Sequence, residues 1–201
     1  MTVSLAACSN NDEDDNNPEL GKTTDASVSE STEFVPASED GPAQNVPEPR
    51  LPAVATENTE EGAEATLEYF WEAAQYSRLT GETSHIEKIS ADDCEFCNSF
   101  VEDWRSAYEA GKWAVPQGEV ELDIAESWST ENAPDRAHEV DFLFTILEPS
   151  VDLYTSDGQL EQPSEGSGEE SDWYAFMLYD ATAQLWEIEW IGLEELVTWE
   201  D

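Results

Sequence analysis

The sequence predicts an α+β domain in which three helices pack on a curved, mainly antiparallel sheet. Two observations carry this prediction. Apolar residues recur at helical spacing as far as Tyr108, and they alternate with polar residues from Val120 onward. Pro116 and Gly118 stand where the period changes. Helices followed by about four to six strands are typical of α+β domains, and such a sheet can close into a cone around an apolar pocket.

The first helix is expected at about Thr59–Thr80. Asn58 is a suitable N-cap with Glu61 as its capping-box partner, and Gly81 ends the helix. One face carries an apolar stripe: Ala63, Leu67, Phe70, Trp71 and Ala74. We assign this stripe to the core rather than to a ligand site, because such stripes pack helices onto sheets.

A short second helix and a longer third helix follow. Ser84 and Glu87 form a capping box for the second helix, and Ser90 can cap the third. The third helix has a stripe at spacings of three and four: Cys97, Phe100, Val101, Trp104 and Tyr108. Gly111 is expected to end it.

The second half contains segments that alternate between apolar and polar residues. The expected strands are Val120–Trp128, His138–Leu147, Val151–Tyr154, Trp173–Tyr179 and Leu185–Ile191. Asp180–Gln184 joins the last two as a hairpin, and Glu161–Ser171 is expected to be a loop. In the second strand, Leu143 and Leu147 fall on the face opposite to Phe142 and Phe144.

The charge is strongly negative: 48 Asp and Glu residues stand against 7 Lys and Arg, for a formal net charge of −41. Nucleic acid is excluded as a partner, because neutralising phosphates requires a basic patch. Such a surface also repels anionic lipids. We interpret the charge mainly as a source of solubility; a docking surface for a cationic partner or divalent cations is the alternative.

The N-terminal residues Leu5-Ala6-Ala7-Cys8 match a bacterial lipobox. The match predicts a lipid on Cys8, which would hold the chain at the outer face of the cell membrane. Only four residues precede the motif, where a signal peptide has a basic region and an apolar stretch, so either the true start lies further upstream or the chain as given would not be exported. The predicted organisation is a signal remnant at 1–8, a disordered acidic tether at 9–57 and the folded domain at 58–201.

Cys94 and Cys97 have three interpretations. A disulfide is favoured, because residues i and i+3 in a first helical turn have Cα atoms about 5 Å apart and an exported protein is oxidised. A redox pair is less suitable, since Asp92, Asp93 and Glu95 oppose thiolate formation. A zinc site would need ligands beyond a single C-x-x-C and two histidines.

Several motifs resemble those of an actinobacterial lipoprotein family of unknown function. They are a Pro-rich lead (Pro47, Pro49, Pro52), GAEA at Gly62–Ala65, Tyr-x-x-x-Thr-Gly at Tyr76–Gly81, and the C-x-x-C before Tyr108 and Gly111. The resemblance extends from about Pro49 to the end. It implies a cone similar to nuclear-transport-factor-2-like domains, shared with ketosteroid isomerase and SnoaL-type proteins, and a location at the cell surface. It implies no activity.

No catalytic, metal or cofactor motif is found in the sequence. His138 could be a base in the cone, but a capping or core-rim role is favoured, since no acid stands at a defined spacing. The first hypothesis is a non-enzymatic surface module that binds a small ligand or an envelope protein through its pocket or its open sheet face. The alternatives are a small isomerase or cyclase that works in the pocket, and a structural envelope component.

Overall fold

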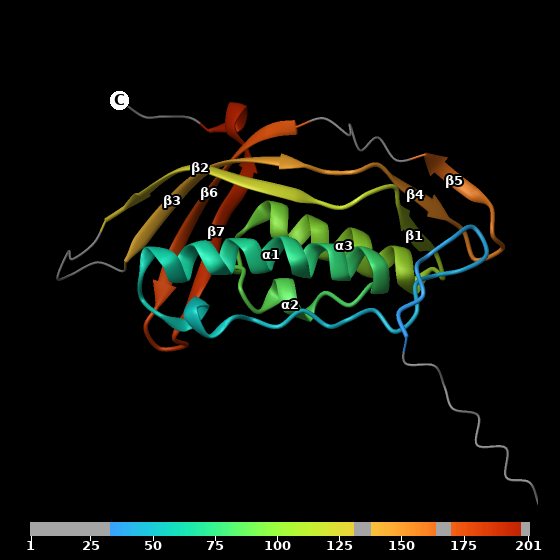
Figure 1. Ribbon diagram of the computed structural model, residues 1–201, viewed down its shortest axis with the longest axis horizontal. Coiled ribbons are helices and arrows are strands. Elements are labelled where there is room, and N and C mark those ends of the chain that lie inside the picture. Colours follow the sequence, from blue (N-terminus) through green and yellow to red (C-terminus); the bar gives the residue numbers. More distant parts are fainter. Residues whose placement is uncertain (1–32, 131–137, 164–169, 198–201) are drawn as a thin grey trace, which may run out of the picture. The chain divides into compact units, whose positions relative to one another are not determined.

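The computed structural model describes residues 33–130, 138–163 and 170–197 (Figure 1). It confirms the α+β prediction. The helices are α1 (Glu60–Thr80), α2 (Ser84–Glu87) and α3 (Glu95–Glu109), with short 3-10 helices η1 (Ala53–Thr56) and η2 (Glu194–Leu196). The strands are β1 (Trp113–Pro116), β2 (Glu121–Ser129), β3 (Glu139–Leu147), β4 (Val151–Tyr154), β5 (Leu160–Pro163), β6 (Glu170–Asp180) and β7 (Leu185–Leu193).

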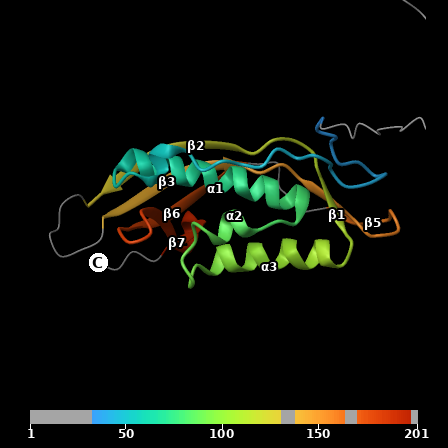
Figure 2. The ribbon, with the colours of Figure 1, turned by 90° about the horizontal axis from the view of Figure 1, so that it is seen from below.

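The strands form two antiparallel sheets. The larger has the order β2-β3-β6-β7, and the smaller has the order β1-β4-β5. Register shifts in β2–β3, at Ile124/Glu126, and in β6–β7, at Phe176/Met177, mark β-bulges, which bend a strand and increase its twist. The helices lie on one face of the larger sheet, with α2 next to both α1 and α3 (Figures 1 and 2).

Helix α1 begins one residue later than its predicted cap implies. Thr59, rather than Asn58, is the N-cap, and its Oγ1 accepts a hydrogen bond from the Gly62 amide at 3.1 Å. Gly81 ends the helix as predicted, with φ of 73°. A Cβ at this position would lie 2.4 Å from the Tyr108 side chain, so both the backbone conformation and the close approach of α3 require glycine.

Helix α3 is capped by a cysteine instead of Ser90. The Sγ of Cys94 accepts the amide of Cys97 at 3.3 Å, and the helix begins at Glu95. Ser90 instead bonds back to the carbonyl of Ile86 at 2.8 Å, and its backbone forms a bridge to Ile188 of β7. The turn between the two helices is therefore fixed to the sheet before α3 starts.

The core lies between the helices and the inner face of the larger sheet. Strand residues alternate in burial, and the inner positions of β3, β6 and β7 are almost completely buried: Val140, Phe142, Phe144, Ile146, Trp173, Ala175, Met177, Trp186, Ile188 and Ile191. The predicted α1 stripe is buried against them, with every member at most 3% exposed. Burial of each large apolar side chain in this way stabilises the folded state by about 1.5–3 kcal/mol.

The structure differs from the sequence-based organisation at residues 33–57, which were assigned to the tether. These residues, here called the lead segment, pack against the domain, and Ala55 is fully buried. The sequence did not reveal this packing for two reasons. The segment has few large apolar side chains, so it shows no periodic pattern, and main-chain carbonyls make many of its contacts. The rest of the predicted tether and the signal remnant, residues 1–32, lie outside the described residues.

Two strands were not predicted. Trp113–Pro116 forms β1, although Pro116 was read only as part of the change of period, and Leu160–Pro163 forms β5, although residues from 161 onward were expected in a loop. Pro116 ends β1, which pairs with β4, and Pro163 ends β5. Each proline stands at a strand end, where its missing amide hydrogen is tolerated. These segments are short, and their alternation is too brief to be recognised in the sequence.

Candidate groove

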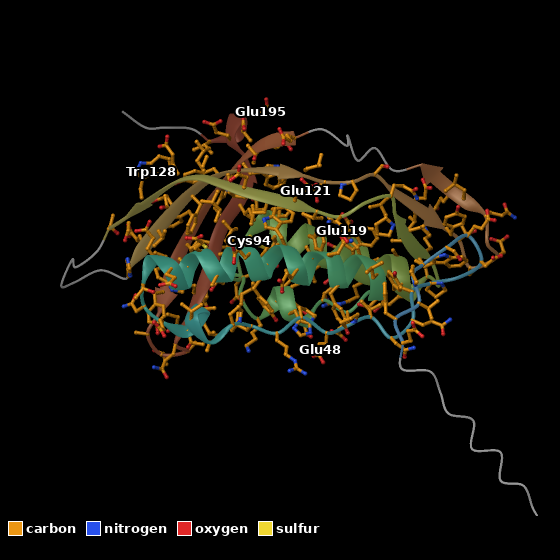
Figure 3. All side chains as sticks on the ribbon, in the orientation of Figure 1. Glu48, Cys94, Glu119, Glu121, Trp128 and Glu195 are labelled. Atoms are coloured by element: carbon orange, nitrogen blue, oxygen red, sulfur yellow. A yellow bond between two sulfur atoms is a disulfide. The ribbon has the colours of Figure 1, made fainter. Side chains whose placement is uncertain are left out.

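A groove of about 930 Å3 lies where the lead segment, α1 and the start of β2 meet. This groove is lined by residues from three parts of the chain: Phe34 and 46–50 of the lead segment; Glu68, Trp71, Glu72, Gln75, Tyr76 and Leu79 of α1; and Glu119, Val120 and Leu122. Figure 3 labels Glu48 on the lead segment and Glu119 before β2, with α1 between them in that view. The groove is thus built by segments far apart in the sequence.

The lead segment is held in place by hydrogen bonds to its carbonyl oxygens. Trp113 Nε1 donates to Ser38 at 2.8 Å. At the other end, Tyr179 donates from its hydroxyl to Thr56 at 2.9 Å, and Trp186 donates from Nε1 to Glu57 at 2.8 Å. The prolines of the lead restrict its backbone to an extended form between these points. This wall of the groove therefore has a defined path.

Two buried polar atoms at the groove have no partner among the described residues: Nε1 of Trp71 and Oε1 of Gln75. Both residues line the groove, and Trp71 is only 3% exposed. The residues are one helical turn apart, and they present a donor and an acceptor. Buried polar groups are nearly always hydrogen-bonded, so a pair without partners requires an explanation.

The rim of the groove is mostly acidic. Glu48, Glu68, Glu72 and Glu119 are exposed there, together with one cation, Arg50. The field of these carboxylates reaches the neighbouring phenols. Burial raises the pKa of Tyr76, and Glu48 and Glu82 raise it further, while the Thr80 hydrogen bond lowers it.

The pKa of Tyr69 is raised by burial and then by Glu48 and Glu72. The groove therefore sits in a negative potential, which favours a positively charged group in it.

The cysteines that the sequence singled out are away from this groove. Cys94 and Cys97 form a disulfide with Cα atoms 5.3 Å apart, and each is 1% exposed. They lie at the first turn of α3, inside the core. Cys8 lies outside the described residues. Within the described ranges, no group of three or more His, Cys, Asp or Glu side chains could hold a metal ion.

His138 lies at the rim of the core. Its Nδ1 donates to Oδ1 of Asn58 at 2.8 Å, and its Nε2 lies 2.7 Å from the Ser129 hydroxyl. The ring also packs on Trp186 at 5.0 Å between centroids. Both nitrogens are thus used to hold Asn58, at the start of α1, to the sheet, which agrees with the rim role favoured from the sequence.

The interior that was expected to hold an apolar pocket is filled by aromatic rings. Trp71 of α1 meets Trp173 edge-on at 5.5 Å, and Phe96 meets Trp173 at 5.1 Å. The buried polar or charged residues of the described chain are Thr66, Ser77, Arg78 and Thr83, so no Asp, Glu or His is buried in this part of the molecule. The groove therefore lies at the side of the helical layer, and the space between the helices and the larger sheet is filled by side chains.

A second, smaller hollow of about 320 Å3 lies beside α3. Phe96, Phe100 and Trp104 line it, and an ion pair between Arg78 and Glu148 closes one side. The Arg78 guanidinium also lies 5.2 Å from the Phe100 ring centroid. Because the polar groups of this hollow already have partners, it makes a weaker candidate for a binding site than the groove.

The sequence identified part of the groove but not its role. Trp71 was assigned to the core, and its ring is in the core; the residue also lines the groove, and its buried Nε1 has no partner among the described residues. Gln75 carried a signal that was not used: it is a polar residue one turn after Trp71 on an apolar helix face. Pro47 and Pro49 were noted as a Pro-rich lead within the expected tether rather than as a wall of a groove.

The sequence profile of one protein family matches residues 32–190; its description is "Family of unknown function (DUF6318)". No curated protein matches the chain. Among solved structures, the chain is similar to the intermembrane space region of the chloroplast protein ARC6, with a TM-score of 0.36 and 6% identity. That comparison covers 67% of this chain and 95% of the other, and it carries no inference about function. No helix of the described residues is long and apolar enough to cross a membrane.

Proposed function

The chain belongs to DUF6318, a family of unknown function, and we propose that it is a non-enzymatic binding domain whose ligand occupies the groove. The observation that carries this proposal is the pair of unpartnered polar atoms, Trp71 Nε1 and Gln75 Oε1, at the wall of a groove with apolar lining. Ligand pockets typically combine apolar walls with a few polar groups that fix orientation.

The chemistry of the groove defines a class of ligand. The indole N–H needs an acceptor, and the amide oxygen needs a donor. A carboxamide or peptide group supplies both. Val120, Leu122 and Leu79 favour an apolar substituent, and the acidic rim favours a positive charge. We therefore propose a ligand that carries an amide, an apolar group and a cation.

Binding requires a small movement of the groove wall. Both polar atoms are buried in the free protein, so a ligand reaches them only when neighbouring side chains or the lead segment shift. Residues 46–50 lie between the carbonyl contacts near the two ends of the lead segment, and Glu48, whose side chain is 71% exposed, contacts His85 there, so this wall can shift by giving up a surface contact. Hydrogen bonds from the ligand to the two atoms would offset the free energy that this opening costs.

The isomerase or cyclase alternative has no specific support in the described residues. A pocket enzyme of that kind needs an acid or base that projects into its cavity. The carboxylates at the groove, such as Glu68 and Glu72, are exposed, and the interior contains aromatic rings in place of an open cavity. Binding without chemistry is the simpler account of this arrangement.

We also propose that the domain is extracytoplasmic and tethered through a lipid on Cys8. The lipobox at Leu5–Cys8 and the Cys94–Cys97 disulfide support this location, since disulfides persist in oxidising compartments. The same proposal includes a fold similar to nuclear-transport-factor-2-like domains, as the family resemblance of the sequence motifs implies. A precursor with an upstream start should take up a fatty-acid label, and Cys8→Ala should lose it. Label retained in Cys8→Ala would contradict the anchor.

The groove is tested by titrating the full chain with N-acetyl-leucyl-lysine amide while amide and indole N–H resonances are recorded by NMR. We expect shifts confined to 46–50, the facing side of α1 and 119–122. The matched peptide N-acetyl-leucyl-glutamate amide should bind at least about 10-fold more weakly, because it meets the acidic rim. Shifts elsewhere on the domain, or equal affinity for both peptides, would refute the proposed site.

A further inference from the structure

In the described chain, the second face of the larger sheet is not covered by α1, α2 or α3, although the three-residue helix η2 contacts β6. Figure 1 shows α1, α2 and α3 together on one side of the strands β2, β3, β6 and β7. We call the opposite side the outer face. Strand register places eight large apolar or aromatic side chains on it: Trp128, Leu143, Leu147, Tyr174, Phe176, Leu178, Leu185 and Trp190.

These residues lie in rows across the strands, and one row is interrupted by a carboxyl group. Trp128 pairs with Asp141, Asp141 with Phe176, and Phe176 with Trp190, so Asp141 separates Trp128 from Phe176 in the row that crosses all four strands. Tyr174 lies in the adjacent row, with its ring centroid 5.8 Å from that of Trp190. Trp128 is 46% exposed. An apolar patch of this kind, rimmed by polar residues, is typical of an interaction site.

The sequence of β6 supports the same conclusion. Residues 173–179 read Trp-Tyr-Ala-Phe-Met-Leu-Tyr, without a charged residue. A strand with one face in water alternates apolar and polar residues, whereas a continuous apolar run is typical of a strand covered on both faces. The inner residues of this run are covered by the helices, and its outer residues are only partly buried in the described chain. The outer face of β6 therefore has the composition of a covered surface.

The charge around this face determines what can cover it. Acidic residues surround the apolar rows: Glu121, Asp123, Glu126, Asp172, Asp180 and Glu187. In the described chain, β2, β3, β6 and β7 contain no Lys or Arg. A second copy placed face to face would bring two acidic rims together, and an anionic membrane would be repelled in the same way.

We propose that the outer face docks a basic polypeptide surface, whose apolar centre covers Tyr174 and Phe176 and whose Lys or Arg side chains meet the acidic rim. This proposal does not depend on the groove, which lies on the helical side of the molecule. It assigns part of the negative charge to recognition in addition to solubility. Complementary charge would speed association and fix orientation, while the apolar rows supply affinity.

The test uses the full chain and a blocked nine-residue peptide of alternating leucine and lysine. A serine–lysine peptide of the same charge measures purely electrostatic binding. We expect the leucine–lysine peptide to bind at least about 10-fold more tightly, with Leu143→Ser/Phe176→Ser removing this difference, since these side chains supply the apolar contact. Thermal unfolding confirms that the variant is folded. Equal binding of the two peptides would overturn the proposal.

Two variants with the same change of net charge test whether the peptide is bound by the acidic rim or by the overall negative charge of the protein. Asp123→Lys/Glu126→Lys changes the rim, and Glu102→Lys/Asp103→Lys changes the exposed side of α3 by the same charge. We expect at least about a 10-fold loss of affinity in the first and less than about 2-fold in the second, because rim charges act locally. Equal losses would overturn the proposal. A dimer in solution that Phe176→Ser dissociates would also overturn it, because a second copy would then cover the face.

Discussion

Nε2 of His85 lies 3.3 Å from Oε1 of Glu48, and this contact joins α2 to the middle of the lead segment. The other ring nitrogen, Nδ1, lies 2.7 Å from the hydroxyl of Tyr69, a residue of α1 that is 2% exposed. One histidine therefore links α1, α2 and the wall of the groove.

The first prediction follows from this link. His85→Ala removes a partner of the Tyr69 hydroxyl, and leaving a buried hydroxyl unsatisfied destabilises a protein by about 1–3 kcal/mol. The free energy of unfolding, measured in urea, should fall by about this amount. Lys88→Ala, at an exposed site just after the same helix, should have little effect. Equal stability of the two variants would show that His85 does not link these elements.

The second prediction concerns the lead segment. A chain that begins at residue 33 should be as stable as the full chain, because the described contacts of the domain begin there. A chain that begins at residue 58 loses buried Ala55 and leaves the indole N–H of Trp186 without its acceptor. We expect it to lose several kcal/mol, roughly the sum of these terms. Equal melting temperatures for the two shortened chains would restore the boundary at residue 58.

The third prediction concerns the disulfide. Cys94→Ala/Cys97→Ala should destabilise the domain by about 2 kcal/mol, since closing such a short loop removes little chain entropy from the unfolded state. In the chain that begins at residue 33, which lacks Cys8, the intact mass should rise by that of two hydrogens on reduction, and no thiol should be alkylated beforehand. Two alkylatable thiols without reductant would contradict the disulfide. The variant is expected to leave peptide binding in the groove unchanged.

The fourth prediction is a gain in stability on mild acidification. Burial raises the pKa of Asp141, and it raises the pKa of Glu187 and Glu189, with further contributions from nearby carboxylates. A group whose pKa is raised by folding binds a proton at a higher pH in the folded state than in the unfolded state. Its stabilising contribution is complete below the unfolded pKa and is lost as pH rises through the folded pKa.

Unfolding free energy should therefore increase as pH falls from neutral toward the ordinary carboxyl pKa of about 4. Glu82 acts in the opposite direction, because hydrogen bonds from Ser84 lower its pKa. Asp141→Asn should reduce the gain, and its amide oxygen can still accept the hydrogen bond from the Tyr174 hydroxyl. Glu102→Gln removes an equal charge from the exposed surface of α3 and should preserve the slope. The same slope in both variants would contradict the role of Asp141.

The fold was predictable from the sequence to the extent that apolar periodicity determines it. The stripe of α1 and the alternation of β3 each specify one buried face, so the helices and the large sheet were recognised. Thr59 was missed as a cap because the neighbouring Asn58 is at least as good a capping residue, and Cys94 was missed because serine, as at Ser90, caps helices much more often than cysteine does. The lead segment was missed because its carbonyl oxygens carry no signal in the side-chain sequence.

The groove was less predictable than the fold. Its walls come from residues 46–50, α1 and 119–122, and their proximity is a property of the tertiary structure. The outer face was partly visible, since Leu143 and Leu147 were placed opposite to the core side of their strand. We propose that a separate polypeptide covers that face, and the sequence of this chain alone does not identify it.

The central claim is that Trp71 and Gln75 hold a ligand in the groove, and the affinity of Trp71→Phe for N-acetyl-leucyl-lysine amide tests it most directly. Phenylalanine keeps an aromatic ring in the core and lacks the indole N–H. We predict an affinity about 3- to 10-fold weaker than that of the unmodified chain, as expected for one lost hydrogen bond. Trp104→Phe, beside the smaller hollow, should bind as the unmodified chain does. Undiminished affinity in Trp71→Phe would contradict the account.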